Sequence, residues 1–389
     1  MLLEGLKVVE MSTWVAGPSC AAVLADWGAE VVKVESPDGD VTRAFFVNPA
    51  DGQSPIYANE NRGKKGVVLD TRKPEGRASL KALLKDADIF VTNTRPGSLK
   101  KVGLDYDSLK GDFPKLIYAA VTGYGLTGPY ANEGAFDITA FWARSGVARA
   151  MIPTDQEPFA SRPGFGDHMT AITTVAAILA ALHERHATGK GRLVETSLIR
   201  AGAYAISWDL ALQLRYGEVV TAQPRHDRPA AISGFFRTKD DRHFVIVPKN
   251  SECFTNVMIA IDRPEAIADP RFAFPILDMD ITREVRAMCD EGFGNLTLDQ
   301  VGERLDSLDV AWAPMGTLKE LAESDRAEQA GCFVTVDDGF GGTFRLPAGP
   351  VRFPEGAPVV QKAAPLLGQH TREVLEAAGL TEAEIAALL

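Results

Sequence analysis

The chain has 389 residues, of which 46% are hydrophobic and 24% charged, a composition typical of a globular protein with two or three domains. Its net charge of −11 argues against nucleic-acid binding. No apolar run reaches the roughly 18 residues of a membrane span, and the N-terminal residues lack the pattern of a signal peptide. We therefore expect a cytoplasmic protein with no membrane partner.

The cysteines and histidines indicate neither disulfides nor a metal centre. Cys20, Cys253, Cys289 and Cys332 are widely spaced and form no C-x-x-C pair, as expected for reduced thiols. The histidines have no neighbouring carboxylate or cysteine cluster at the spacing of a zinc site. The sequence predicts no metal ligand.

The first 35 residues predict a strand, a loop, a helix and a second strand. Residues 6–11 and 31–35 are short apolar strands, residues 12–18 form a turn, and residues 19–27 a helix. This βαβ pattern predicts a parallel sheet. Because the turn contains Gly17 but no G-x-G-x-x-G motif, a dinucleotide-binding protein is only weakly supported.

The alternation of strands and helices continues to residue 129 and predicts a doubly wound α/β domain. A basic glycine loop leads into a strand ending at Asp70, and a helix follows at residues 74–85. Further strands are expected at residues 88–92 and 116–121. The loops after the strands should gather at one edge of the sheet. These loops are residues 12–18, 93–97 and 122–129.

Residues 60–101 form a basic segment in an otherwise acidic chain. They contain eleven Lys or Arg and five acids, a net charge of +6. Such a segment suits a phosphorylated small ligand. The alternative is a solvated helix face with mixed charges, which we favour for Arg77, Lys81 and Lys85.

Residues 163–198 predict a helix that begins at Asp167 and a strand at residues 192–198. Gly164 and Gly166 precede the acid, and Gly189 ends the helix. Asp167 could cap the helix through its carboxylate. It could instead be a nucleophile that backbone donors keep ionised and that attacks a carbonyl carbon. The apolar face of the helix comprises Ala171, Ile172, Val175, Ile178, Leu179 and Leu182.

The remaining segments complete the predicted domain layout. Residues 134–146 should be helical, with Asp137 as a cap or first-turn acid. Residues 201–214 continue as a helix, and residues 235–247 should form a hairpin. We expect a large domain at 1–224, a small α+β domain at 225–325 and a return to the large domain at 326–389, with two short helices starting near Thr371 and Thr381.

A set of motifs, taken in order through nearly the whole chain, resembles the family III CoA-transferases. This family includes formyl-CoA transferase, carnitine CoA-transferase and the α-methylacyl-CoA racemases. The likeness is weakest over residues 215–310. The motifs are L-K-V-V-E-M-S-T-W-V-A-G-P, V-V-K-V-E-S, N-R-G-K-K-G-V-V-L-D, K-P-E-G, N-T-R-P-G, T-G-Y-G-L-T-G-P, G-D-H-M-T, A-L-H-E-R-H-A-T-G-K-G and P-L-L-G-Q-H-T-R-E-V-L.

The resemblance implies a homodimer of two interlocked subunits that binds acyl-CoA and carboxylic acid substrates. Coenzyme A would be a substrate carrier, with no cofactor held permanently. Asp167 would be the nucleophile and pass through an aspartyl anhydride and an aspartyl-CoA thioester. Backbone amides near Gly166 and Ala16 are candidates for stabilising the oxyanions. The positions that match CoA contacts are Trp14, Val15, Ala16, Leu69, Arg72, Asn93, Thr94 and Lys101.

Two other functions remain open. A racemase would move an α-proton with Asp137 and Asp167 as acid/base partners. The racemases of the family have a histidine just before the position of Asp137, whereas this chain has Phe136, which favours transfer. An NAD-linked or non-enzymatic protein is the third possibility. Phe136, Phe141 and Trp142 resemble a segment of transferases for larger hydrophobic or aromatic acids, and the alternative for these three is an ordinary core.

Overall fold

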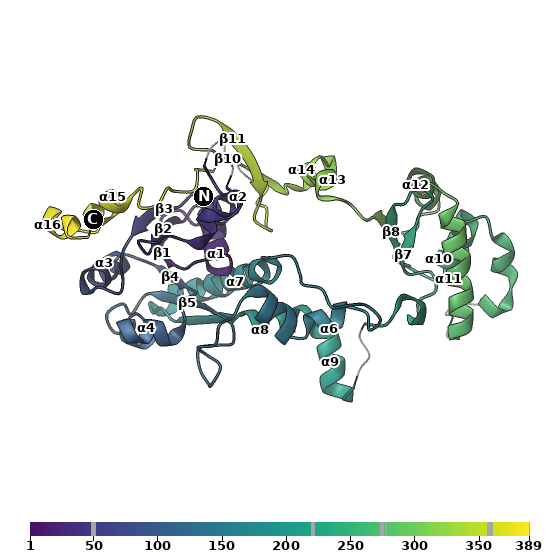
Figure 1. Cartoon of the computed structure of the whole chain (residues 1–389), viewed down its shortest axis with the longest axis horizontal. Coiled ribbons are helices and arrows are strands. Elements are labelled where there is room, and N and C mark those ends of the chain that lie inside the picture. Colours follow the sequence, from purple (N-terminus) through teal and green to yellow (C-terminus); the bar gives the residue numbers. More distant parts are fainter. Residues whose placement is uncertain (48–51, 219–221, 273–275, 277, 356–360, 389) are drawn as a thin grey trace. The chain divides into compact units, whose positions relative to one another are not determined.

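The chain folds into two compact units in a computed structural model (Figure 1). The larger unit consists of Met1–Met151, Pro158–Val219 and Glu328–Leu389, and the smaller of Ile152–Glu157 and Val220–Ala327. The smaller unit is therefore inserted into the chain of the larger one. The structure describes residues 1–47, 52–218, 222–272, 276, 278–355 and 361–388.

A six-stranded parallel sheet organises the larger unit. Its strand order is β3-β2-β1-β4-β5-β6, so the order reverses between β1 and β4. Val8 of β1 pairs with Val31 on one side and with Ile89 on the other. This order is that of a doubly wound sheet and confirms the predicted mixed α/β fold. The strands are β1 (Lys7–Met11), β2 (Glu30–Glu35), β3 (Lys65–Val68), β4 (Ile89–Thr92), β5 (Ile117–Thr122) and β6 (Leu193–Ser197).

Helices cover both faces of the sheet because successive side chains of each strand point to opposite faces. Val8 is buried in a cluster with side chains of α1 (Ala16–Asp26) and α7 (Phe165–Thr188). Val9 is buried in the opposite cluster with side chains of α3 (Pro74–Leu84). Both layers are visible in Figure 1.

The other elements of the larger unit surround this sheet. They are η1 (Val41–Ala44), α2 (Pro55–Asn61), α4 (Pro96–Val102), α5 (Tyr106–Leu109), η2 (Asp137–Arg144), α6 (Val147–Met151), α8 (Leu198–Ala205), α9 (Ser207–Tyr216), β10 (Phe333–Asp337), β11 (Thr343–Pro347), α15 (Thr371–Ala377) and α16 (Glu382–Ala386). Thr381 caps α16, as the sequence predicts.

Helix α7 is, in the described part of the chain, the one helix long and apolar enough to cross a membrane by length and composition alone. Core helices of water-soluble proteins pass the same test. Ala171, Val175 and Ile178 of α7 are buried against the sheet. The expected absence of a membrane partner stays a prediction.

The smaller unit packs an antiparallel sheet against helices. The predicted hairpin is confirmed, with Phe236 of β7 opposite Phe244 of β8. Both rings contact Phe293, at centroid distances of 5.3 and 5.0 Å. The elements are η3 (Arg225–Asp227), β7 (Gly234–Arg237), β8 (His243–Ile246), α10 (Glu252–Ala260), η4 (Pro264–Ala268), η5 (Pro270–Phe272), α11 (Met279–Gly294), α12 (Leu298–Ser307), β9 (Trp312–Pro314) and α13 (Leu318–Ala322), and α14 (Asp325–Ala330) marks the return to the larger unit.

Two helix starts near the cavity described below differ from the sequence prediction. Helix α1 begins at Ala16 instead of residue 19, and Pro18 is tolerated because the first-turn amide of a helix needs no partner within the helix. Helix α2 was not predicted. Its start nevertheless carries ordinary signals, because Ser54 accepts a hydrogen bond from the amide of Tyr57 and Pro55 is the first helical residue.

A buried network of charged side chains connects β1 and β2 with the segments beside them. Lys33 Nζ is 3.1 Å from both Glu10 Oε1 and Asp40 Oδ2, and Lys64 Nζ is 2.7 Å from Glu10 Oε2. The side chains of Glu10, Lys33, Asp40 and Lys64 are all fully buried. Lys64 and Arg62, which pairs with Asp26, are therefore structural. Both belong to the basic segment of residues 60–101, whose role in binding a phosphorylated ligand stays a prediction.

We predict that Lys33→Met destabilises the fold by about 3–5 kcal/mol, because it leaves two buried carboxylates without their shared cation. The measurement is the free energy of unfolding in urea. Lys81→Met is the control, since Lys81 forms an exposed pair with Asp112 and should change stability by less than about 1 kcal/mol. Equal effects of the two substitutions would contradict the prediction.

Candidate active site

A cavity of about 1050 Å³ opens at the C-terminal edge of the sheet, within the larger unit. Its lining includes Trp14 from the loop after β1, Asn93 from the loop after β4, and Thr122 and Gly123 at the end of β5. The loops after β1 and β4 diverge because the strand order reverses there, which leaves a crevice. The expectation that the strand-end loops gather at one edge is confirmed.

The loop after β1 is held in a strained conformation. Trp14 has a φ of 67°, which costs a non-glycine residue about 1–3 kcal/mol. Asn93 clamps the preceding residue, because its Oδ1 accepts from Thr13 N at 3.0 Å and its Nδ2 donates to Thr13 O at 2.6 Å. Asp40 Oδ1 accepts from Trp14 N at 3.3 Å. These bonds present the indole to the cavity, where it meets the ring of Phe136 edge-on at 5.2 Å.

The nucleophile candidate, Asp167, lies in the first turn of α7 but does not cap the helix. The N-cap is Gly164, with a φ of 86° and no side-chain cap. Asp137 Oδ1 instead accepts from Gly166 N at 3.0 Å. The expectation that Asp167 caps the helix is therefore wrong, because a carboxylate from another segment occupies that position. The Gly166 amide is likewise engaged and is not free to stabilise an oxyanion in this structure.

Gly166 allows this close approach. A β-carbon at this position would lie 2.1 Å from Phe141 Cγ and 2.6 Å from Asp137 Oδ1. Asp137 begins η2, a π-helix, a form that occurs frequently at functional sites. Phe141 and Trp142 are buried in the core, whereas Phe136 is 52% exposed and lines the cavity.

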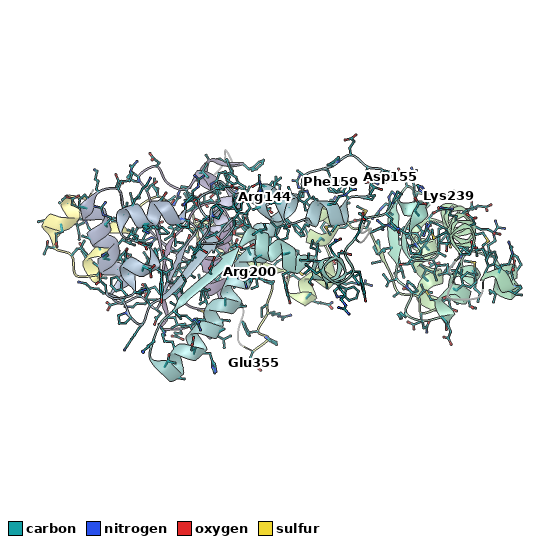
Figure 2. The ribbon with its side chains drawn as sticks, turned by 90° about the horizontal axis from the view of Figure 1, so that it is seen from below. Arg144, Asp155, Phe159, Arg200, Lys239 and Glu355 are labelled. Atoms are coloured by element: carbon teal, nitrogen blue, oxygen red, sulfur yellow. The ribbon has the colours of Figure 1, made fainter. Side chains whose placement is uncertain are left out.

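The segment before α7 is anchored to η2. Trp142 Nε1 donates to the carbonyl oxygen of Phe159 at 2.9 Å, and the two rings lie 5.9 Å apart. Phe159 and Arg144, the last residue of η2, are labelled in Figure 2. This contact helps to bring Asp137 and Asp167 to the same wall of the cavity.

Both acids of the site, Asp167 and Asp137, have raised pKa values. Burial and, to a smaller extent, the charge of Asp137 raise the pKa of Asp167, His168 opposes them, and the net result is a pKa of about 7. Burial also raises the pKa of Asp137, whose Oδ2 is buried without a hydrogen-bond partner among the described residues. The expectation that backbone donors keep Asp167 fully ionised is wrong, because those donors serve Asp137.

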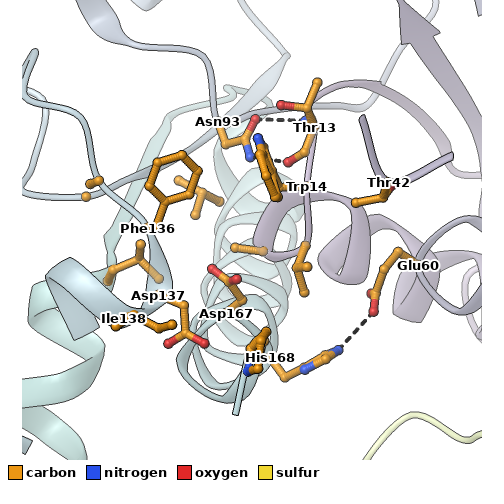
Figure 3. A pocket seen from close by; sticks show the side chains of 18 of the residues that line it. Thr13, Trp14, Thr42, Glu60, Asn93, Phe136, Asp137, Ile138, Asp167 and His168 are labelled. Carbon is orange, nitrogen blue, oxygen red and sulfur yellow. Dashed lines mark hydrogen bonds and ion pairs between the residues drawn. The ribbon is translucent and has the colours of Figure 1, made fainter. Parts of the chain in front are cut away.

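Two residues of the site were not predicted from the sequence. Glu60 of α2 and His168 of α7 both line the cavity, and Glu60 Oε1 accepts from His168 Nε2 at 3.1 Å (Figure 3). This hydrogen bond raises the pKa of His168 to about 9. The Ser54-Pro55 helix start could have placed Glu60 on a helix, but nothing in the local sequence pairs it with a residue 108 positions away.

The predicted coenzyme A contacts divide into two groups. Five of them line the cavity: Trp14, Val15, Ala16, Asn93 and Thr94. The other three lie outside the lining. Leu69 is buried in the core, Arg72 pairs with Asp70 at 2.8 Å, and Lys101 lies exposed on α4. A role for these three stays a prediction. Of the basic segment, Arg95 lines the cavity.

We predict that stability depends on pH through Asp167. Its pKa is about 7 in the folded chain, against an ordinary value of 3.8, so the folded state holds more protons than the unfolded state between these two pH values. The wild type should therefore lose stability relative to Asp167→Asn as pH rises from about 4 to 7. Urea unfolding of both proteins at several pH values measures this, and a pH-independent difference would contradict it.

Comparisons with known proteins identify the family. The family model described as CoA-transferase family III matches residues 3–371. The chain is 33% identical to (R)-2-hydroxy-4-methylpentanoate CoA-transferase of Clostridioides difficile, over 99% of this chain and 97% of that protein. It is 32% identical to cinnamoyl-CoA:phenyllactate CoA-transferase of Clostridium sporogenes, over 99% and 95%.

A solved structure agrees with the sequence comparisons. A CAIB/BAIF family protein of Brucella suis superposes with a TM-score of 0.84 at 28% identity, covering 97% of this chain and 99% of that one. The match extends over both units. The chain therefore belongs to CoA-transferase family III and is an enzyme of that class.

Proposed function

We propose that the enzyme moves CoA from an acyl-CoA donor to a free carboxylic acid, with Asp167 as the nucleophile. The observation that carries this proposal is that Asp167 lies in the cavity wall while Asp137 takes the capping position at the start of α7. A carboxylate that is not used as a cap is available to react. The relatives named as CoA-transferases support the same reaction class.

The proposed chemistry is two exchanges at one carboxylate. An Asp167 oxygen attacks the thioester carbon of the donor, the C–S bond breaks, and CoA leaves as a thiolate. The thiolate attacks the aspartyl carbon of the mixed anhydride, which releases the donor acid as a carboxylate and leaves an aspartyl-CoA thioester. The acceptor carboxylate attacks this thioester and displaces the thiolate. The thiolate then attacks the acceptor's acyl carbon, which forms the new acyl-CoA and regenerates Asp167.

Each exchange passes through an oxyanion that needs stabilisation. The positive end of the α7 dipole points at the Asp167 region, since this residue lies in the first turn. The Gly166 amide donates to Asp137 and is not available. The loop at Trp14–Ala16 is a second source of backbone donors. We propose that this loop, with Asn93 and Thr94, also holds the pantetheine arm of coenzyme A.

The acid substrate is proposed to carry an aromatic or branched apolar side chain. Phe136, Ile138 and Phe45 line the cavity, and Trp14 contacts Phe45 at a centroid distance of 5.6 Å. The relatives are named for phenyllactate and for (R)-2-hydroxy-4-methylpentanoate, which are 2-hydroxy acids with apolar side chains. Apolar surface of this kind favours such acids over small polar ones.

We also propose a homodimer. Helix α9 has no buried residue, and four of its large apolar side chains are exposed: Trp208 by 89%, Leu212 by 44%, Leu214 by 79% and Tyr216 by 73%. Tyr204 of α8 is 79% exposed as well. An apolar face of this size is typical of a protein–protein contact, and a second copy of the chain would cover it.

We predict that Asp167→Asn lowers transfer from cinnamoyl-CoA to phenyllactate by about 10⁴-fold or more, because an amide oxygen cannot form the anhydride. Hydroxylamine should trap an acyl group on the wild type and none on the variant, as measured by mass spectrometry. Asp107→Asn is the control, since Asp107 is exposed on α5 and pairs with Lys110. A wild type that never carries the adduct would refute the proposed mechanism.

For the dimer, we predict that light scattering gives the wild type twice the chain mass of 41.9 kDa. Trp208→Glu combined with Leu214→Glu should shift the mass toward that of one chain, because it places two charges on the proposed contact. Leu318→Glu is the control, since Leu318 is 86% exposed in the smaller unit. A monomeric wild type would contradict the proposal.

A further inference from the structure

The cavity lining carries more acidic than basic side chains, although the proposed acid substrate is itself an anion. Four acidic residues, Glu60, Glu133, Asp137 and Asp167, are present in its described lining. A free carboxylic acid is an anion at neutral pH and must nevertheless reach the carbon bonded to Asp167. The cationic residues in the described lining are Arg95 and His168. Of these, His168 is the immediate neighbour of Asp167 on α7.

His168 is held in place by contacts at both ends of the residue. Its Nε2 donates to Glu60 Oε1 at 3.1 Å, and its backbone amide donates to the carbonyl of Gly164 at 2.9 Å. Its side chain is 52% exposed, whereas that of Glu60 is 4% exposed. Figure 3 shows Asp167 with Asp137 on one side and the His168–Glu60 pair on the other.

The carboxylate of Glu60 is fixed in turn by hydrogen bonds from two neighbouring side chains. Its Oε2 accepts from the hydroxyl of Ser19, and its Oε1 accepts from Asn59 Nδ2 at 2.8 Å. Burying a carboxylate costs free energy, and these hydrogen bonds offset that cost by stabilising the ionised form, which lowers the pKa of Glu60. Its hydrogen bond makes His168 a cation at neutral pH, because the pKa of His168 rises to about 9. The groups that face this cation are Glu60, Asp137 and Asp167.

We propose that His168, oriented by Glu60, is the counter-charge that holds one carboxylate anion beside the reacting carbon throughout the cycle. Before acylation that anion is Asp167. After acylation Asp167 is neutral, and the free acid, released or incoming, takes its place as the anion. His168 is thus a binding residue for the acid substrate, and this inference rests on the proposed function.

The charge balance of the reaction explains why one cation at this position is sufficient. Each half-reaction exchanges one carboxylate for another at the same position, so a single fixed cation serves both states without rearrangement. Without it, the incoming acid would face Glu60, Asp137 and Glu133, with Arg95 the one cationic residue left in the described lining. Repulsion from like charges in a partly desolvated cavity is large enough to weaken binding by tenfold or more.

Steady-state kinetics of His168→Gln, with cinnamoyl-CoA and phenyllactate, test the inference. We expect the KM for phenyllactate to rise about tenfold, while the KM for cinnamoyl-CoA changes less than twofold. His168→Lys restores the charge and should recover most of the lost affinity for the acid. His183→Gln is the matched control, because His183 lies on the same helix outside the cavity lining and should change neither constant.

Glu60→Gln is a second, independent variant, because it leaves the imidazole in place and removes the carboxylate that keeps it charged. It should raise the KM for phenyllactate in the same direction. An unchanged KM for the acid in His168→Gln, an equal rise in both KM values, or a failure of His168→Lys to restore affinity would overturn the inference. Hydroxylamine trapping separates the two proposals, because the adduct on Asp167 should still form in His168→Gln, whereas its absence in the wild type refutes the proposed function instead.

Discussion

The hydrogen bond from the Gly166 amide to Asp137 is the contact on which the site depends. An acid in the first turn of a helix usually satisfies the free amides at the helix start. Here a carboxylate from a π-helix 29 residues earlier does so, and it can approach because residue 166 has no side chain. Asp167 is consequently left facing the cavity. The same contact places two carboxylates close together, so that the charge of Asp137 makes Asp167 harder to ionise.

That repulsion bears on the proposed role of Asp167 as the nucleophile. A carboxylate with a raised pKa is a better nucleophile once ionised, but a smaller fraction of it is ionised at neutral pH. His168 opposes the shift, and buried Glu60 keeps His168 charged. The balance of these groups leaves Asp167 with a pKa of about 7. At neutral pH a substantial fraction of the carboxylate is then ionised, and it is also more nucleophilic than an ordinary carboxylate.

The buried network of Glu10, Lys33 and Lys64 supports the other wall of the cavity. Lys33 also donates to the carbonyl of Ser12 at 3.1 Å, and Ser12 is the first residue of the loop that carries Trp14. Asp40 binds both Lys33 and the amide of Trp14. The charges are expensive to bury, yet they tie β1, β2 and the strained loop together. The indole is therefore presented to the cavity by the same network that holds the centre of the sheet.

The sequence by itself determined the parallel α/β architecture, the strand-end loops that meet at one edge, the family and Asp167 as the candidate nucleophile. Periodicity and motif order are local properties, so they can be read without coordinates. Only the tertiary structure decided that Asp137 caps α7, that Lys64 and Arg62 are buried, and that Glu60 pairs with His168. Each of these depends on which residues, distant in the chain, the packing brings within about 3 Å of one another, and no local pattern encodes that distance.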